Sequence, residues 1–226
     1  MLEVGAGLGI VSCFLASRER NITSLEPGGV GFEENRVFAT LVHSHLKSNH
    51  QHLPLLIEEV SQDQHGKFDF IFSSNVIEHV ASVEQCLTTL HAVLRPGGTM
   101  MHNCPNYFVP YEPHFCIPLV PFIPSVTRFL IPSSMRESST WRSLNFIMLR
   151  DVKGIAHRLG ADVQFEHGLL ADAFARFETD PEFCSRQKVL ASLYPWMKKF
   201  GVMYFLRKLP PLLTTPMVFL WRREAE

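Results

Sequence analysis

The chain of 226 residues is 46% hydrophobic and 19% charged, which indicates one globular domain with a sizeable core. Its formal net charge of −1 gives no general attraction to phosphate backbones, so we expect no nucleic-acid partner. Five scattered cysteines without a CxxC pair favour reduced thiols in the cytoplasm over a disulfide framework or a zinc site. We expect no signal peptide, because the first residues read as a strand and a glycine loop, and no membrane-spanning segment, because no apolar run reaches roughly 20 residues.

Short apolar runs alternate with helical stretches through the first two thirds of the chain, which predicts a parallel sheet covered by helices. The predicted strands cover 2–4, 23–25, 55–57 and 67–75, and the predicted helices cover 10–17 and 32–46. Apolar residues at helical spacing predict a further helix over 83–94. The stretch "RPGG" at 95–98 is expected to stop that helix before a fifth strand, "TMMHNC".

Two irregular regions follow. The stretch "PNYFVPYEPHFCIPLVPFIPSV" at 105–126 packs prolines among aromatic residues and predicts an ordered apolar loop or lid. After a helix at 151–159 and a strand at 161–166, an insertion with helices of its own covers about 169–215 and precedes a final strand at 216–223. The insertion contains the basic, aromatic stretch "YPWMKKFGVMYFLRKL" at 194–209, which we expect to form a helix.

The glycine-rich segment "LEVGAGLGI" at 2–10 carries the most specific motif. Glycines let the backbone turn sharply and approach a ligand closely. A dinucleotide-binding loop would need its third glycine at position 10, where this chain has Ile10. A nicotinamide-dependent oxidoreductase is therefore disfavoured.

The ExGxGxG spacing, Glu26 after the second strand, "FDFIFSSNVIEHV" and "LRPGG" occur in the order typical of one family. Together they resemble the class I S-adenosylmethionine-dependent methyltransferases of the small-molecule type, well over 1–105 and more weakly over 161–166 and 216–223. The resemblance implies an α/β, Rossmann-like fold with a seven-stranded, mostly parallel sheet, helices on both faces and an antiparallel last strand. It also implies a missing or reduced N-terminal cap, because the first strand begins at once.

The same resemblance divides a single domain, 1–226, into a cofactor-binding half at 1–105, a substrate loop at 106–150 and a C-terminal half at 151–226. The implied cofactor is S-adenosyl-L-methionine. Its amino-acid portion would lie over the glycine loop, and its ribose hydroxyls would bond to Glu26. Glu58 or Glu59 would lie near adenine, and Ser74 and Asn75 near the methionine moiety. The full implied cofactor set is Glu3, Gly5, Ala6, Gly7, Gly9, Glu26, Glu59, Ser74 and Asn75.

Catalytic candidates come from the ends of the fourth and fifth strands. His114 is the most economical base for a hydroxyl acceptor, although a role in fixing the proline-rich loop explains it equally well. His79, which follows Glu78, has capping and solvation as a competing explanation. Tyr107 completes the candidate set, and Glu112 lies in the same loop. His102 is expected to be a core histidine, and no metal ion is expected.

The sequence predicts methyl transfer to a small molecule, with a hydroxyl of a sugar, lipid-linked or secondary-metabolite acceptor preferred. The alternative is a binding or scaffold protein that keeps the fold with weak or no catalysis. The stretch at 194–209 suggests a weak peripheral contact with the inner membrane. The competing interpretation is that its aromatic face packs over the sheet and the loop at 105–126.

Overall fold

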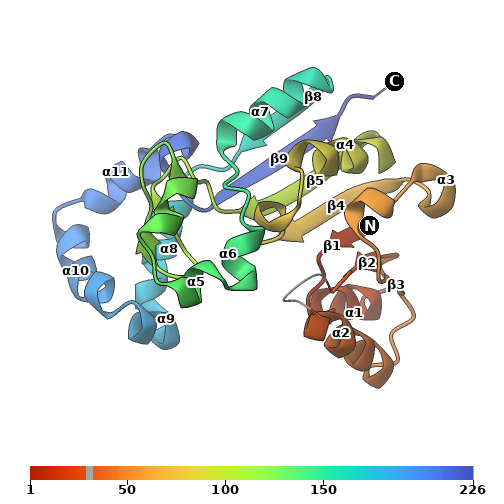
Figure 1. Ribbon diagram of the computed structural model, residues 1–226, viewed down its shortest axis with the longest axis horizontal. Coiled ribbons are helices and arrows are strands. Elements are labelled where there is room, and N and C mark those ends of the chain that lie inside the picture. The colour runs from red at the N-terminus through yellow and green to blue at the C-terminus, as the bar shows by residue number, and fades with distance from the viewer. Residues whose placement is uncertain (29–32, 226) are drawn as a thin grey trace.

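A seven-stranded sheet organises the computed structural model, which describes residues 1–28 and 33–225 (Figure 1). Its strand order is β3-β2-β1-β4-β5-β9-β8, and every neighbouring pair is parallel except those that β9 makes with β5 and β8. The fold predicted from the sequence, with a reversed last strand, is therefore confirmed. The strands are β1 Leu2–Val4, β2 Thr23–Leu25, β3 Gln51–Leu53, β4 Phe68–Ser74, β5 Leu94–Cys104, β8 Ala161–Phe165 and β9 Met217–Arg223.

Helices lie on both sides of this sheet, with α1 and α2 on one side and α4 and α7 on the other (Figure 1). The loop at 106–150 contains a small hairpin, β6 Tyr111–Glu112 and β7 Ile117–Pro118, outside the main sheet. The helices are α1 Ile10–Ser17, α2 Glu33–His45, α3 Gln62–His65, α4 Val83–Val93, α5 Ser133–Arg136, α6 Ser139–Ser143, α7 Leu149–Arg158, α8 Leu169–Ala175, α9 Pro181–Arg186, α10 Lys188–Lys199 and α11 Val202–Lys208. Of the helix expected over 32–46, Phe32 lies outside the described residues.

The core fills the side of the sheet that faces α4 and α7. One row of paired residues, Leu2, Ile71, Met100 and Trp221, is completely buried there. On the opposite side the row that contains Phe72, Met101 and Leu220 stays partly exposed. Apolar burial on the α4 side thus holds the strand ends in register, and these ends carry the candidate site.

Two predicted strand boundaries are wrong. The third strand is Gln51–Leu53 rather than 55–57. It is a polar edge strand that pairs only with β2, so it lacks the apolar run by which buried strands are recognised. The "RPGG" stretch lies within β5, because α4 already ends at Val93 and Leu94 pairs with Phe68. The register between β4 and β5 shifts across this stretch, and Gly97 there has a φ of +75°.

The insertion also differs from expectation. The stretch at 194–209 forms parts of two helices, α10 and α11, and Gly201 separates them with a φ of +69°. Apart from the buried Tyr194, its large aromatic side chains are more than half exposed, so the prediction that an aromatic face with Trp196, Phe200 and Tyr204 packs over the sheet is wrong. Within the described residues, no helix has the length and apolar character needed to cross a membrane.

Candidate active site

The glycine loop joins β1 to α1 at the end of the sheet where the parallel strands finish. Gly5, Gly7 and Gly9 have φ values of +66°, +54° and +72°, a left-handed conformation that favours glycine. Backbone hydrogen bonds fix the loop: the Ala6 N–H donates to the Leu25 carbonyl at 2.8 Å, and the Gly9 N–H donates to the Ala6 carbonyl at 2.8 Å. The loop is therefore tied to β2 as well as to its own strand.

Gly5 and Gly7 face different surroundings. A Cβ atom on Gly5 would lie 2.4 Å from Val76 Cγ2, so this glycine is required for contact with the segment after β4. A Cβ on Gly7 would meet no atom of the described residues within 4 Å. Gly7 therefore exposes bare backbone to open space, as a loop that a ligand approaches closely must.

Glu26 lies against this loop and is only 5% exposed. Its Oε2 accepts a hydrogen bond from the Gly7 N–H at 2.7 Å, and its Oε1 accepts one from the Gly28 N–H at 3.1 Å. Each carboxylate oxygen retains further lone-pair capacity, so the group can still accept bonds from a ligand. The position of Glu26 beside the loop matches the prediction, and its contact with a ribose stays a prediction.

Glu3 lies at the foot of the loop and accepts a hydrogen bond from the Ser12 hydroxyl of α1. Burial raises the pKa of Glu3, the hydrogen bond from Ser12 opposes that rise, and the nearby charge of Glu26 adds to it. Glu3 thus braces the junction of β1 and α1. Its predicted role in cofactor binding stays a prediction.

The remaining cofactor candidates are spread over two strand ends. Ser74 and Asn75 are exposed at the end of β4, where Asn75 has a φ of +55° and its N–H donates to the Asn103 carbonyl at 2.8 Å. Glu59 accepts a hydrogen bond from the Leu56 N–H at 2.7 Å and so caps its own short turn, whereas Glu58 is half-buried. Assignment of either glutamate to adenine stays a prediction.

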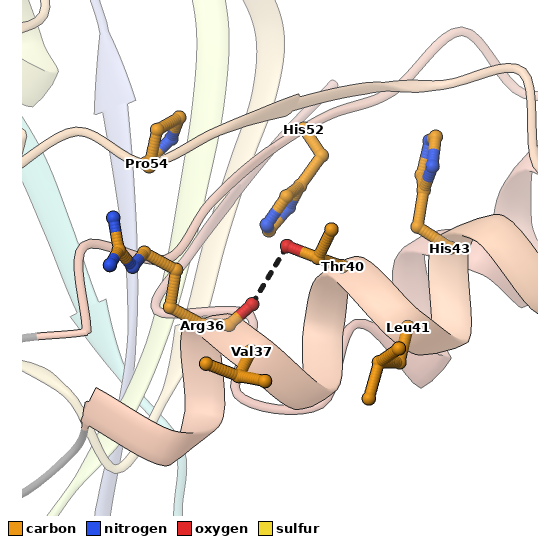
Figure 2. Close-up of a pocket in the computed structure, with 7 residues that line it drawn as sticks. All are labelled: Arg36, Val37, Thr40, Leu41, His43, His52 and Pro54. Carbon is orange, nitrogen blue, oxygen red and sulfur yellow. Dashed lines mark hydrogen bonds between the residues drawn. The ribbon is translucent and has the colours of Figure 1, made fainter.

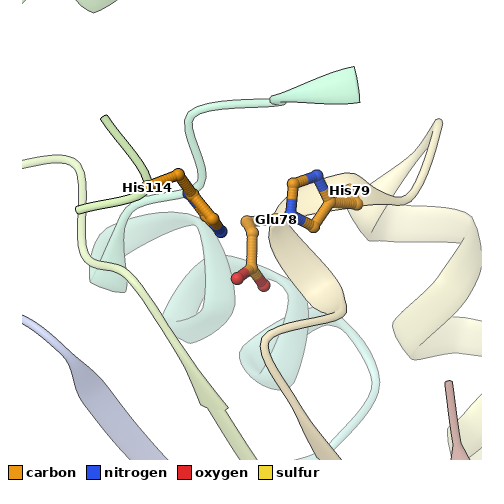
Figure 3. A group of neighbouring side chains, drawn as sticks. All are labelled: Glu78, His79 and His114. Carbon is orange, nitrogen blue, oxygen red and sulfur yellow. The ribbon is translucent and has the colours of Figure 1, made fainter. Parts of the chain in front are cut away.

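A polar cluster of Glu78, His79 and His114 lies just beyond these residues (Figure 3). Glu78 and His79 belong to the short turn Ile77–His79 after β4, and Asn145 holds that turn through bonds to the carbonyls of Ile77 and Val80 at 2.7 and 3.0 Å. The ring centroids of His79 and His114 are 5.1 Å apart. The Glu78 side chain is completely buried, and within the described part of the chain neither carboxylate oxygen has a hydrogen-bond partner.

Burial and neighbouring charges set the protonation of this cluster. Burial raises the pKa of Glu78 to about 7 and lowers that of His79 to about 4. The His79 Nδ1 lies 2.7 Å from the Ser143 hydroxyl oxygen. At neutral pH the cluster therefore combines a neutral imidazole with a carboxyl group close to its midpoint of titration.

Glu112 contacts the polar cluster through His114 and is itself completely buried. It accepts bonds from His114 Nδ1 at 2.6 Å, the Phe115 N–H at 2.7 Å and the Tyr107 hydroxyl at 3.2 Å. Burial alone would raise the pKa of Glu112, but the bonds from His114 and Phe115 lower it. The bond to Glu112 in turn raises the pKa of His114. His114 is therefore a better proton donor and charge partner than a base.

The structure brings two of the three predicted catalytic residues together. Tyr107 is almost fully buried and orients Glu112, and burial raises the pKa of its phenol. No catalytic role was predicted for Glu78, whose only signal in the sequence is its place before His79, and Glu112 was noted only as a member of the loop. His102 is a buried core histidine bonded to the Ser73 hydroxyl at 2.7 Å, as predicted.

The polar cluster could also hold a metal ion, since one ligand atom from each of its three residues lies within 4.8 Å of the others. One carboxylate and two imidazoles form a donor set suited to divalent transition metals. The expected absence of a metal stays a prediction.

A separate cavity of about 540 Å³ lies between α2 and β3 (Figure 2). Its lining comprises Arg36, Val37, Thr40, Leu41, His43, His52 and Pro54. None of these residues belongs to the glycine loop or to the polar cluster. We therefore assign the chemistry to the strand ends and not to this cavity.

Comparison with known proteins gives three findings. The family described as "Methyltransferase domain" matches residues 1–164. An uncharacterised protein of Mycobacterium tuberculosis, Rv1509, is 34% identical over 199 residues, which cover 83% of this chain and 66% of that protein. The matched part thus spans just under two thirds of the relative's length.

More distant similarities agree in fold. A ubiquinone biosynthesis O-methyltransferase of Pseudomonas aeruginosa is 23% identical over 164 residues, 70% of this chain and 68% of that protein. The structure of a Haemonchus contortus phosphoethanolamine N-methyltransferase in complex with S-adenosyl-L-methionine aligns with a TM-score of 0.57 and 16% identity. That alignment covers 100% of this chain and 48% of the other.

Proposed function

The chain belongs to the methyltransferase domain family, and from this premise we propose that it transfers a methyl group from S-adenosylmethionine to a hydroxyl group of a small molecule. The observation that carries the hydroxyl acceptor is the buried, unpartnered carboxyl group of Glu78 between two imidazoles. A hydroxyl group must lose its proton to a base as its oxygen attacks the methyl carbon. A neutral amine attacks through its nitrogen lone pair and needs no base for that step.

The glycine loop and Glu26 support cofactor binding. The cofactor's methionine portion would lie over the open backbone at Gly7, and the ribose hydroxyls would donate to Glu26. The polar cluster is within reach of that position, because Gly5 packs on Val76 and Glu78 follows only two residues later. Cofactor and acceptor would therefore meet at the ends of β1 and β4.

The proposed reaction is a direct displacement. The acceptor oxygen attacks the methyl carbon within about 3 Å and in line with the sulfonium. A new C–O bond forms, the S–CH₃ bond breaks, and the sulfur keeps the electron pair as S-adenosylhomocysteine. The hydroxyl proton passes to Glu78, whose pKa of about 7 allows its carboxylate to accept a proton at neutral pH. His114, paired with Glu112, stabilises the negative charge that develops on the oxygen.

The test measures S-adenosylhomocysteine release with a panel of hydroxylated acceptors and their amine analogues. We expect turnover of a hydroxyl acceptor that rises with pH through about 7, as Glu78 ionises. Glu78→Gln should lower kcat by about a hundredfold and remove this pH dependence, since a general base contributes on that order. The matched control is Glu84→Gln. Glu84 is an exposed acid on α4 that forms an ion pair with Arg158 at the end of α7.

Two results would contradict the proposal. Methylation of amines but not of hydroxyls would reject the acceptor class, and a Glu78→Gln variant with an unchanged rate would reject the cluster as proton acceptor. Calorimetric titration with S-adenosylmethionine and S-adenosylhomocysteine separates catalysis from the scaffold alternative. A folded protein that binds neither compound would support the scaffold.

A second version of the same reaction follows from the donor set of the polar cluster. A divalent cation held by Glu78, His79 and His114 would lower the pKa of a bound hydroxyl and replace the base. It would also neutralise the unpartnered Glu78 carboxylate, which otherwise leaves two buried oxygens unsatisfied. Loss of turnover in a chelator, with recovery on adding a divalent transition metal such as Zn²⁺, Fe²⁺ or Mn²⁺, would support this version, and insensitivity to the chelator would support the metal-free base.

A further inference from the structure

Helices α10 and α11 carry an exposed aromatic surface at the end of the molecule opposite α1 and α2 (Figure 1). Trp196 is 65% exposed, Phe200 56%, Tyr204 59% and Phe205 68%. We call these four residues, together with Lys198, Lys199, Arg207 and Lys208, the aromatic–basic surface. Side chains of this size are normally found in the core of a soluble domain, so their joint exposure requires an explanation.

The opposite sides of the two helices are already used for packing. Tyr194 is buried, its hydroxyl donates to Glu178 at 2.9 Å, and its ring lies 5.7 Å from that of Phe177. On α11, Arg207 bonds to Asp172 of α8 at 2.6 Å. These contacts fix both helices to the rest of the insertion and leave their aromatic side chains facing outward.

Cations accompany the aromatic rings. From residue 183 to residue 223 the chain has no aspartate or glutamate, although its net charge is only −1. Lys198 and Arg207 form ion pairs with Glu178 and Asp172. Lys199 and Lys208 instead lie over the rings of Phe200 and Tyr204, with Nζ 6.0 and 4.1 Å from the ring centroids. Positive charge is thus concentrated beside exposed rings.

We propose that the aromatic–basic surface docks on an anionic lipid bilayer. Tryptophan and tyrosine rings favour the boundary between headgroups and acyl chains, where one end is apolar and the other is wet. Lysine and arginine beside them are attracted to anionic headgroups. Glu178 and Asp172 offset two of the four cations, and the segment 183–223 itself carries no aspartate or glutamate. Charge complementarity therefore identifies the occupant as an anionic membrane surface. This inference is independent of the proposed reaction.

The aromatic–basic surface is connected to the candidate active site through the turn that follows α11. After α11 the chain forms the turn Pro211–Leu213, and the Asn106 side chain donates to the carbonyls of Pro211, Leu212 and Thr214 at 3.3, 2.9 and 3.1 Å. Asn106 begins the loop that carries Glu112 and His114. The surface that meets the bilayer is therefore tied to the substrate loop.

The experiment measures sedimentation with vesicles of phosphatidylcholine containing about 30% phosphatidylglycerol, and with vesicles of phosphatidylcholine alone. We expect binding to the first at low salt, weaker binding at high salt, and little binding to the second. Fluorescence gives a second readout, because Trp196 is exposed whereas Trp141 and Trp221 are only 6% and 0% exposed. A blue shift on binding would therefore report Trp196 entering the interface.

Two charge variants separate this surface from general electrostatics. The variant K198Q/K199Q/R207Q/K208Q should weaken vesicle binding at least tenfold, since each cation near an anionic surface contributes up to about fivefold. The control R18Q/R20Q/K47Q/K153Q removes the same charge from exposed positions on other elements and should bind as the unmodified chain does. Absence of binding to anionic vesicles, equal binding to phosphatidylcholine, or equal losses in both variants would each overturn the proposal. The exposure of the aromatic–basic surface would then point to a protein partner instead of a membrane.

Discussion

The glycine loop and the polar cluster lie at the ends of neighbouring strands, β1 and β4, but they are held in place in different ways. The loop consists of one short run of sequence, and its bonds run between backbone groups and one carboxylate. The polar cluster joins residues 36 positions apart, 78 and 114, and depends on side chains such as Asn145 and Glu112 for its geometry. One region is specified by local conformation and the other by tertiary contacts.

This difference explains what each region tolerates. A binding site built from backbone groups tolerates substitutions that preserve φ and leave the backbone accessible, because its hydrogen bonds come from N–H groups and not from side chains. A site of buried ionisable side chains depends on every partner, since an unpaired buried charge is costly. Substitutions in the loop should therefore act on cofactor affinity, and substitutions in the polar cluster should act on proton transfer and on pH dependence.

The largest effect should come from filling the open space at Gly7. Gly7→Val places a branched side chain where the cofactor would lie, and we expect S-adenosylmethionine affinity to fall at least a hundredfold by calorimetry. NAD should bind neither the variant nor the unmodified protein. An affinity for NAD comparable to that for S-adenosylmethionine would contradict the assignment of the loop.

Gly97→Val is the matched control for this prediction. Gly97 also has a positive φ, +75°, and a Cβ there also meets nothing within 4 Å, but it lies at the start of β5. Both variants therefore carry the same kind of backbone strain, about 1–2 kcal/mol. Equal losses of affinity in the two would show that strain, and not exclusion of the cofactor, is responsible.

The sequence predicted the glycine loop and Glu26 because their geometry is local. Glycine spacing fixes the turn, and a carboxylate after the next parallel strand arrives at the same edge of the sheet. Glu78 could not be identified in this way, because its burial depends on how the proline-rich loop folds over it. The edge strand β3 was misplaced for a related reason: it has little apolar burial, so neighbouring Leu55 and Ile57 gave the stronger signal.

Glu26→Ala should have the next largest effect on cofactor affinity. It sharpens the comparison of the glycine loop with the polar cluster, because Glu26 is a side chain in a region held mainly by backbone groups. Charge-assisted bonds to the ribose are worth about 1.5–3 kcal/mol each, so we expect at least tenfold weaker binding of S-adenosylmethionine. The variant should stay folded, which the melting temperature will show. Unchanged affinity in a folded variant would reject the ribose assignment, and Glu84→Ala serves as the control for loss of one carboxylate.

The smallest effect concerns the pair of Glu112 and His114, and it has a defined pH window. The His114 pKa is raised above its usual 6.5, so the stability from His114 is complete below pH 6.5 and is lost as pH rises through the folded-state value. The Glu112 pKa is lowered below 4.5, so its contribution is present above pH 4.5 and is lost as pH falls through its folded-state value. The pair therefore stabilises the fold most between pH 4.5 and 6.5.

His114→Gln tests this window through urea unfolding at pH 6 and pH 9. The His114 side chain is 28% exposed, so solvent screens part of the attraction and we expect a cost of about 0.5–1 kcal/mol at pH 6. As pH rises through the folded-state pKa of His114, the imidazole loses its charge and the charge–charge part of the bond to Glu112 disappears, so the cost should be smaller at pH 9 than at pH 6. His167→Gln, which changes an exposed histidine after β8, should show no such trend. A cost that is the same at pH 6 and pH 9 would mean that Glu112 holds His114 without a contribution from charge, and the polar cluster would then resemble the glycine loop in its indifference to pH.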